Sequence, residues 1–122
     1  MTESQLLELF DLWNQALQSG DAQQVAQLYA EEPIFLPTLS NQVCRNHQEV
    51  TAYFERFLKM RPEAKLDFSN RRLFGDLAVH SGLYSFLLHA TNETVPVRFT
   101  FIYQKLAGEW KILEHHSSCM PE

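Results

Sequence analysis

An apolar stripe at helical spacing runs through the first part of this chain. It is formed by Leu6, Phe10, Trp13 and Leu17. Thr2 with Gln5 three positions later is a capping-box pair, and Ser19-Gly20 is typical of a helix end. The pattern therefore predicts one long amphipathic helix near the N-terminus.

A short second helix is expected after Asp21, which repeats the start signal together with Gln24. Its apolar face is formed by Val25, Leu28 and Tyr29. Residues 31–33, Glu-Glu-Pro, end this helix, and residues 34–36 form a short strand that stops at Pro37.

A third helix is expected after a polar loop over residues 38–45. Asn46 with Glu49 is another capping-box pair, and the helix stops before Pro62 because helical backbone is disfavoured ahead of a proline. Its strong apolar stripe consists of Val50, Tyr53, Phe54, Phe57 and Leu58.

From Ala64 onward the apolar period changes to two, which is typical of strands. The predicted strands are residues 64–74, 77–89, 95–104 and 109–118, joined by turns at 75–76, 91–93 and 107–108. Three helices followed by an antiparallel meander predict an α+β fold, with the helices packed on one face of a curved antiparallel sheet. Such a sheet forms a cone whose open mouth suits a ligand. A length of 122 residues suits one domain covering residues 1–122.

The register of the last hairpin decides which of its side chains face the helices. If Gly108 takes the left-handed third position of a three-residue loop, Phe101 faces Leu113 and Phe99 faces His115. The helix-facing side then carries the odd-numbered residues Phe99, Phe101, Tyr103, Leu113, His115 and Ser117. A two-residue turn would instead turn the other pair, 116 and 118, inward, because a slip of one residue exchanges the faces.

An apolar strand face that ends in His115 and Ser117 has two interpretations. Convergent polar groups at the end of an apolar pocket are typical of a ligand site. A buried His–Ser pair can also simply satisfy backbone groups where the sheet ends. His116 and Ser118 are expected on the outer face, where they meet solvent or another subunit.

Composition and charge exclude several classes of function. The net charge is −5 and the ten Lys and Arg residues are scattered, so nucleic acid is not an expected partner. No apolar run approaches the roughly 18 residues of a membrane span, and the acidic N-terminus is unlike a secretory signal. Cys44 and Cys119 are expected to be free thiols in a reducing, cytoplasmic environment.

Neither a metal nor a nucleotide cofactor is expected. Adjacent strand residues such as His115 and His116 point to opposite faces and cannot share one ion. Four glycines leave little room for a phosphate-binding loop. An isomerase or cyclase would need a carboxylate such as Asp67 or Glu114 inside the cone, and this alternative stays open.

Five stretches together carry a resemblance to a known family. They are LPTLSN (36–41), AYF (52–54), HSGLYSF (80–86), RFTFIY (98–103) and GEWKILEHHSSCMPE (108–122). The chain resembles the small bacterial relatives of the calcium/calmodulin-dependent protein kinase II association domain, in the nuclear-transport-factor-2-like superfamily with its cystatin-like cone. The HHSS ending before Met-Pro, with LPT upstream, is similar to the iota-class carbonic anhydrases. That resemblance implies reversible hydration of carbon dioxide to bicarbonate, in some members without any metal, by a dimer or a larger homo-oligomer.

The resemblance also implies a set of site residues. The catalytic positions fall on Thr38, Tyr53, His115 and Ser117, and Tyr84 is an added substrate-binding position. In the resulting hypothesis the hydroxyls orient water and the carbonate oxygens, while His115 relays the proton. The apolar wall that holds carbon dioxide would be Phe99, Phe101 and Leu113.

A non-catalytic function is the competing hypothesis. The chain would then be an association module that oligomerises through the outer face of the sheet, where Arg98, Trp110 and Ile112 are expected to lie. Its pocket would bind a small polar ligand or nothing. The kinase association domain carries arginines suited to a carboxylate ligand where this chain has Tyr84, Phe101 and Ser117. A strongly anionic ligand held by a basic cluster is therefore not expected.

Overall fold

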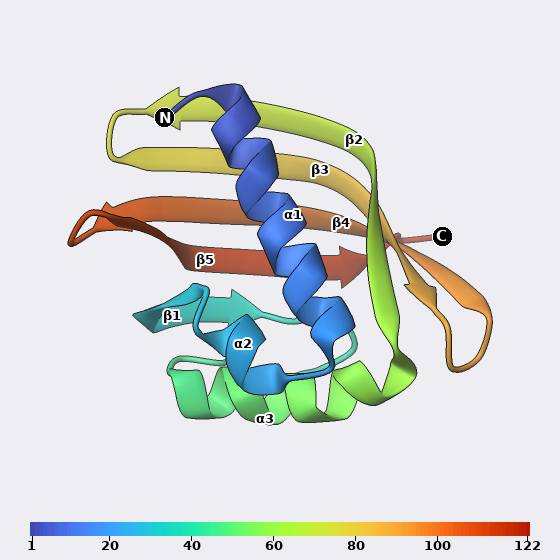
Figure 1. The fold of residues 1–122 in the computed structure, drawn as a ribbon. Helices are drawn as coiled ribbons and strands as arrows, with labels where there is room; N and C mark the ends of the chain where they lie inside the picture. The colour runs from blue at the N-terminus through green and yellow to red at the C-terminus, as the bar shows by residue number, and fades with distance from the viewer.

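A computed structural model describes residues 1–122 (Figure 1). Its elements in chain order are α1 (Glu3–Ser19), α2 (Ala22–Ala26), β1 (Tyr29–Leu36), α3 (His47–Phe57), a 3₁₀ turn (Leu58–Met60), β2 (Pro62–Phe74), β3 (Leu77–Leu88), β4 (Glu93–Leu106) and β5 (Glu109–Cys119). The α+β prediction is confirmed, with three helices and a five-stranded sheet. None of the helices combines the length and the apolar composition that a membrane span requires.

Helix α1 forms as its sequence pattern predicts and crosses one face of the sheet (Figure 1). The Thr2 hydroxyl accepts the Gln5 backbone N–H and the Gln5 side chain accepts the Thr2 N–H, which completes the capping box. Gly20 ends the helix with a left-handed φ of 76°. The predicted apolar stripe is fully buried, so α1 contributes the central layer of the core.

The second helix is shorter than predicted. It stops at Ala26, and Tyr29 begins β1 instead of belonging to the helix face. Tyr29 pairs with Ile112 of β5, and its carbonyl accepts a hydrogen bond from His47 Nε2 at 2.8 Å. Pro33 lies inside β1, which the sheet tolerates because β1 is an edge strand. These long-range contacts outweigh the helical spacing of the local sequence.

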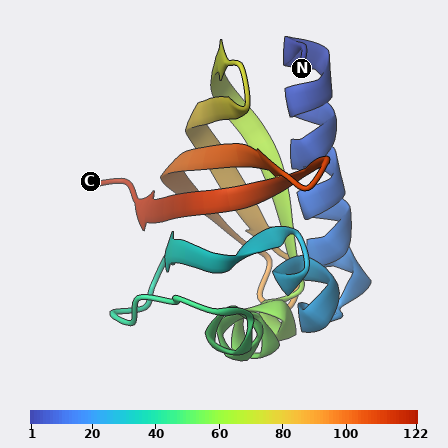
Figure 2. The ribbon, with the colours of Figure 1, turned by 90° about the vertical axis from the view of Figure 1, so that its left-hand side faces the viewer.

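The sheet has the strand order β1-β5-β4-β3-β2. Strands β2 to β5 form the predicted antiparallel meander, whereas β1 pairs with β5 in parallel. The sheet is therefore mixed. Figure 2 shows the helices on one side of the curved sheet and no helix on the other.

The β4–β5 hairpin differs from the predicted register in two ways. Together they restore the predicted facing of His115 and Ser117 but leave the pairing two residues out of the predicted register. Its turn has two residues, Ala107 and Gly108, both with positive φ, so the three-residue loop is wrong. Leu113 then forms a β-bulge, because Ile112 lies opposite Tyr103 while the next paired residue of β5 is Glu114. The extra residue reverses the faces once more. His115 and Ser117 therefore face the helices, as predicted. Their partners on β4 are Phe101 and Phe99, so the predicted pairs Phe101–Leu113 and Phe99–His115 are wrong.

The same bulge corrects two predictions about side chains. Ile112 is buried in the core, where Leu113 was expected, and Leu113 is only half-buried. Ile112 is therefore absent from the outer face, and Trp110 packs partly against the core. Arg98 is exposed on the outer face, as expected. Phe68 and Phe74 are the most exposed apolar side chains of the sheet, and they lie on that face together with Leu77.

Candidate functional site

Five polar side chains meet inside the fold between α1, α3 and the sheet. This polar cluster consists of Thr38, Tyr53, Tyr84, His115 and Ser117. They come from the loop after β1, from α3, from β3 and from β5, and each is at most 7% exposed. All but Tyr53 are joined by side-chain hydrogen bonds. The structure thus brings together every predicted catalytic residue.

Ser117 lies at the centre of the cluster. Its Oγ accepts a hydrogen bond from the Tyr84 hydroxyl at 2.9 Å and is 2.5 Å from the Thr38 Oγ1. The Tyr53 hydroxyl donates to the backbone carbonyl of Thr38 at 2.9 Å. Tyr53 therefore ties the Thr38 loop to α3, and Ser117 ties it to β5.

His115 is held on both ring nitrogens. Its Nε2 is 3.2 Å from the Tyr84 hydroxyl, and its Nδ1 is 2.8 Å from the Tyr29 hydroxyl. Its ring is stacked between Phe101, at a centroid distance of 4.0 Å, and Phe35, at 4.7 Å. These contacts leave the imidazole little freedom to rotate.

Sequence reasoning missed two residues behind His115. The Trp13 indole Nε1 donates to the Tyr29 hydroxyl at 3.3 Å, and both side chains are about 1% exposed. Both had been assigned simply to apolar helix faces. The sequence indicates their role in one way only: a Trp N–H or a Tyr O–H that is buried needs a polar partner.

The cluster borders a small cavity of about 10 Å³. That volume accommodates about one water molecule. Its lining is mostly aromatic: Trp13, Phe35, Thr38, Tyr53, Phe54, Phe57, Tyr84, Phe86, His115 and Ser117. The predicted apolar wall is therefore misplaced. Phe99 and Phe101 lie one layer back, stacked on Tyr84 and His115, and Leu113 borders a separate surface hollow.

Burial keeps the cluster uncharged. It lowers the pKa of His115 well below its usual value, and the neighbouring His116 lowers it further. Burial raises the pKa of Tyr84, against the opposing effect of its hydrogen bond to Ser117, and it also raises the pKa of Tyr53. At neutral pH the cavity is therefore surrounded by hydrogen-bonding dipoles and not by ions.

A second buried histidine lies apart from the cavity. His80 Nε2 is 2.7 Å from the Ser69 Oγ, which also accepts a hydrogen bond from Arg71. Burial and the Arg71 charge lower the pKa of His80 to about 4. Its Nδ1 has no hydrogen-bond partner, and its ring meets Phe10 and Phe99 edge to face. These contacts assign His80 to the packing of the core.

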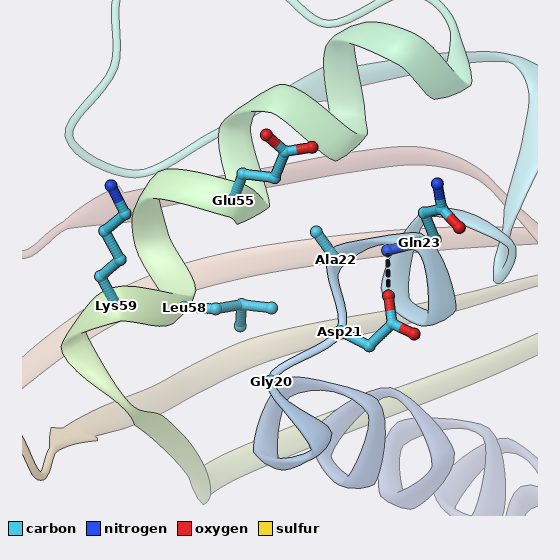
Figure 3. A pocket seen from close by; sticks show the side chains of 7 residues that line it. All are labelled: Gly20, Asp21, Ala22, Gln23, Glu55, Leu58 and Lys59. Carbon is cyan, nitrogen blue, oxygen red and sulfur yellow. Dashed lines mark hydrogen bonds between the residues drawn. The ribbon is translucent and has the colours of Figure 1, made fainter.

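Larger hollows on the surface lack convergent chemistry. Figure 3 shows one, where the Glu55, Lys59 and Gln23 side chains lie apart and do not converge on one point. The one hydrogen bond among its lining residues is the helix cap from the Gln23 N–H to Asp21. No group of three or more His, Cys, Asp or Glu side chains is placed to hold a metal ion.

The carboxylates named for an isomerase or cyclase lie outside the cone. Asp67 and Glu114 are both exposed, and Asp67 accepts a hydrogen bond from Ser85 on the surface. That alternative therefore lacks its carboxylate. Both cysteine thiols are free, with Cys44 buried and Cys119 exposed.

Comparison with solved structures places the fold among the NTF2-like proteins with a cystatin-like fold. An NTF2-like protein from Pseudomonas putida has 22% identity and a TM-score of 0.83 over 95% of this chain and 84% of its own. A Streptomyces avermitilis protein of this group, proposed to be a dehydratase, has 16% identity and a TM-score of 0.83 over 98% and 96%. At these identities the likeness concerns the fold alone.

Two further comparisons define the family. The profile of the calcium/calmodulin-dependent protein kinase II association domain matches residues 2–121. A Xanthomonas campestris protein proposed to be such a domain is 40% identical, with a TM-score of 0.96 over 100% of this chain and 90% of its own. No curated protein matches significantly. The chain belongs to the calcium/calmodulin-dependent protein kinase II association domain family.

Proposed function

We propose that this chain catalyses the reversible hydration of carbon dioxide in the cavity beside Ser117. The observation that carries the proposal is the convergence of the Thr38, Tyr84 and Ser117 hydroxyls on one buried aromatic cavity. Carbon dioxide is apolar and uncharged, and aromatic walls suit it. Bicarbonate carries oxygens that accept hydrogen bonds, and hydroxyl groups suit these. The resemblance of the HHSS ending and LPT to iota-class carbonic anhydrases supports the same reaction.

The reaction needs negative charge to be stabilised on oxygen. A water oxygen forms a bond to the carbon of carbon dioxide, and one C=O electron pair moves onto its oxygen. Hydroxyl donors around the cavity stabilise that oxygen, with a typical effect of about 10²–10³ on the rate per well-placed donor. The proton leaves the attacking water to a second solvent water and then to buffer. This route replaces the predicted relay through His115, because Tyr29 and Tyr84 engage both of its ring nitrogens. Free water is a weak nucleophile because its pKa is about 15.7, so the orientation of both reactants matters.

The size of the cavity sets a condition on this function. A space of about 10 Å³ holds one water but not carbon dioxide as well. Phe57 is the half-buried member of the lining, at the end of α3, and it packs on Tyr53 and Phe86. Movement of the Phe57 ring is the proposed route by which the cavity widens and the substrate reaches Ser117.

Stopped-flow measurement of carbon dioxide hydration, with chelator present, tests the proposal. The wild type should exceed the uncatalysed rate, and Ser117→Ala should lower the rate about 10²-fold or more. Ser118→Ala is the matched control, because Ser118 is the adjacent serine on the opposite face. A wild type no faster than buffer removes the proposal. A Thr38→Ala, Tyr53→Phe, Ser117→Ala triple variant as active as wild type removes the proposed roles.

Self-association is a second candidate function, and it is compatible with the first. Phe68 and Phe74 are each 60% exposed on the face of the sheet that no helix covers. Exposed apolar side chains on an uncovered sheet face can form subunit contacts. We expect a homodimer or larger homo-oligomer in sedimentation experiments and a smaller species after Phe68→Ser with Phe74→Ser. A monomeric wild type would contradict this role.

A further inference from the structure

A continuous hydrogen-bonded chain connects the core to the cavity. It runs through Trp13, Tyr29, His115, Tyr84, Ser117 and Thr38. We infer that the Trp13 indole, acting through Tyr29, sets the direction of this chain, so that the cavity presents a hydroxyl donor and selects small oxygen acceptors such as bicarbonate. The bicarbonate part rests on the proposed function, whereas the direction of the chain does not.

The first step concerns the groups with the least choice. An indole N–H only donates, so the Tyr29 oxygen accepts from Trp13. The Tyr29 hydroxyl has one hydrogen, and its remaining side-chain partner is His115 Nδ1 at 2.8 Å. Tyr29 therefore donates to Nδ1, since otherwise its own hydrogen would be buried without a partner.

The second step fixes the tautomer of His115. Burial disfavours the charged ring, so the neutral imidazole carries one hydrogen. Because Nδ1 accepts from Tyr29, that hydrogen is on Nε2. The Nε2–H then donates to the Tyr84 oxygen at 3.2 Å, and the Tyr84 hydroxyl donates a hydrogen bond to the Ser117 Oγ at 2.9 Å.

The third step reaches the cavity. Ser117 and Thr38 have two hydroxyl hydrogens between them and share one hydrogen bond. Whichever of the two donates, one hydroxyl hydrogen is left without a partner in the protein, and both side chains border the cavity. In the opposite tautomer, Nε2 of His115 would carry no hydrogen and would accept from the Tyr84 hydroxyl. Ser117 would then donate to Tyr84, and Thr38 would donate to Ser117. The cavity would in that case present lone pairs only.

The direction of the chain determines the chemistry that the cavity can perform. A free O–H donor binds an oxygen that carries or develops negative charge. No carboxylate borders the cavity, so no anionic side chain there binds a cation. With its hydrogen on Nε2, His115 offers no lone pair toward Tyr84. Tyr29 and Trp13 are thus positioning residues that act through His115.

Nitrogen NMR of the histidine rings tests the direction in the unmodified protein. At pH 7.5 the His115 ring should carry hydrogen on Nε2 and none on Nδ1, with the resonances identified by their loss in His115→Gln. Hydrogen on Nδ1 overturns the inference. Tyr29→Phe keeps the ring but removes the donor, so it should populate the second tautomer and weaken bicarbonate binding about tenfold. A Tyr29→Phe protein that keeps a pure Nε2–H tautomer would show that Tyr29 does not set the direction.

Titration with bicarbonate and with ammonium tests the selectivity. Bicarbonate should shift the His115 Nε2 resonance in wild type and in Ser118→Ala but not in Ser117→Ala, and ammonium should shift it in none. A comparable response to ammonium overturns the selectivity. If His115 carries hydrogen on Nε2 and the protein binds bicarbonate but does not hydrate carbon dioxide, this inference stands and the proposed enzyme activity is refuted. If the protein hydrates carbon dioxide but His115 carries its hydrogen on Nδ1, the proposed function stands and this inference is refuted.

Discussion

Lowering the pH from 7.5 to 5 is expected to destabilise this fold, because His80 and His115 are both buried in the neutral form. In the unfolded chain each regains a pKa near 6.5 and binds a proton below that pH. In the folded chain each binds a proton only at lower pH. The unfolded state therefore holds more protons across this range, and the free energy of unfolding falls as the pH falls.

The magnitude follows from the pKa of His80. Its lowering from 6.5 to about 4, caused by burial and by Arg71, corresponds to a loss of about 2 kcal/mol between pH 7.5 and pH 5. His115 adds a loss of the same sign, caused by burial and by His116. Small domains are stable by about 5–15 kcal/mol in total, so the effect is large enough to measure.

Urea unfolding followed by tryptophan fluorescence measures this loss. The wild type should lose stability steadily below pH 6.5, and His80→Gln, which cannot titrate, should show a clearly shallower pH dependence. His116→Gln is the control, since His116 is exposed and burial dominates the pKa of His115. Equal stability at pH 7.5 and pH 5, or an unchanged slope in His80→Gln, would refute the argument.

Three further predictions test access, packing and capping. Phe57→Leu replaces the half-buried ring at the cavity with a smaller side chain and should speed carbon dioxide hydration in stopped-flow; an unchanged or slower rate would mean that Phe57 does not limit access. Gly82→Ala would place a Cβ 2.1 Å from the Phe68 carbonyl oxygen, so its unfolding midpoint should fall by the equivalent of about 3 kcal/mol, and wild-type stability would contradict the close approach. Thr2→Ala removes the hydroxyl that accepts the Gln5 N–H and should cost about 1 kcal/mol in urea unfolding, whereas no loss would show that the cap frays in solution.

Local structure could be read from the sequence wherever the signal was itself local. The capping residues Thr2 and Asn46 begin α1 and α3 as predicted, because a cap involves groups only three residues apart. The meander of β2 to β5 followed from apolar alternation and its turns. Tyr29 was misassigned to a helix, because its strand exists only through pairing with β5, more than 80 residues later.

The candidate site depended on more distant contacts. The prediction that His115 and Ser117 face inward was confirmed, but through a two-residue turn and a compensating bulge at Leu113 in place of the predicted loop. No sequence rule locates a bulge, since it depends on which side chain the core can accept from β5. Thr38 and Tyr53 were predicted as site residues from the family resemblance alone.

By itself, the sequence determined the helices, the antiparallel strands and the stock of uncharged polar side chains, since spacing, caps and turns act over a few residues. The tertiary structure decided that β1 lies parallel to β5, that Ile112 replaces Leu113 in the core, and that Trp13 and Tyr29 stand behind His115. Those outcomes depend on burial and on the need of each buried donor for an acceptor, conditions that exist only once distant segments pack together.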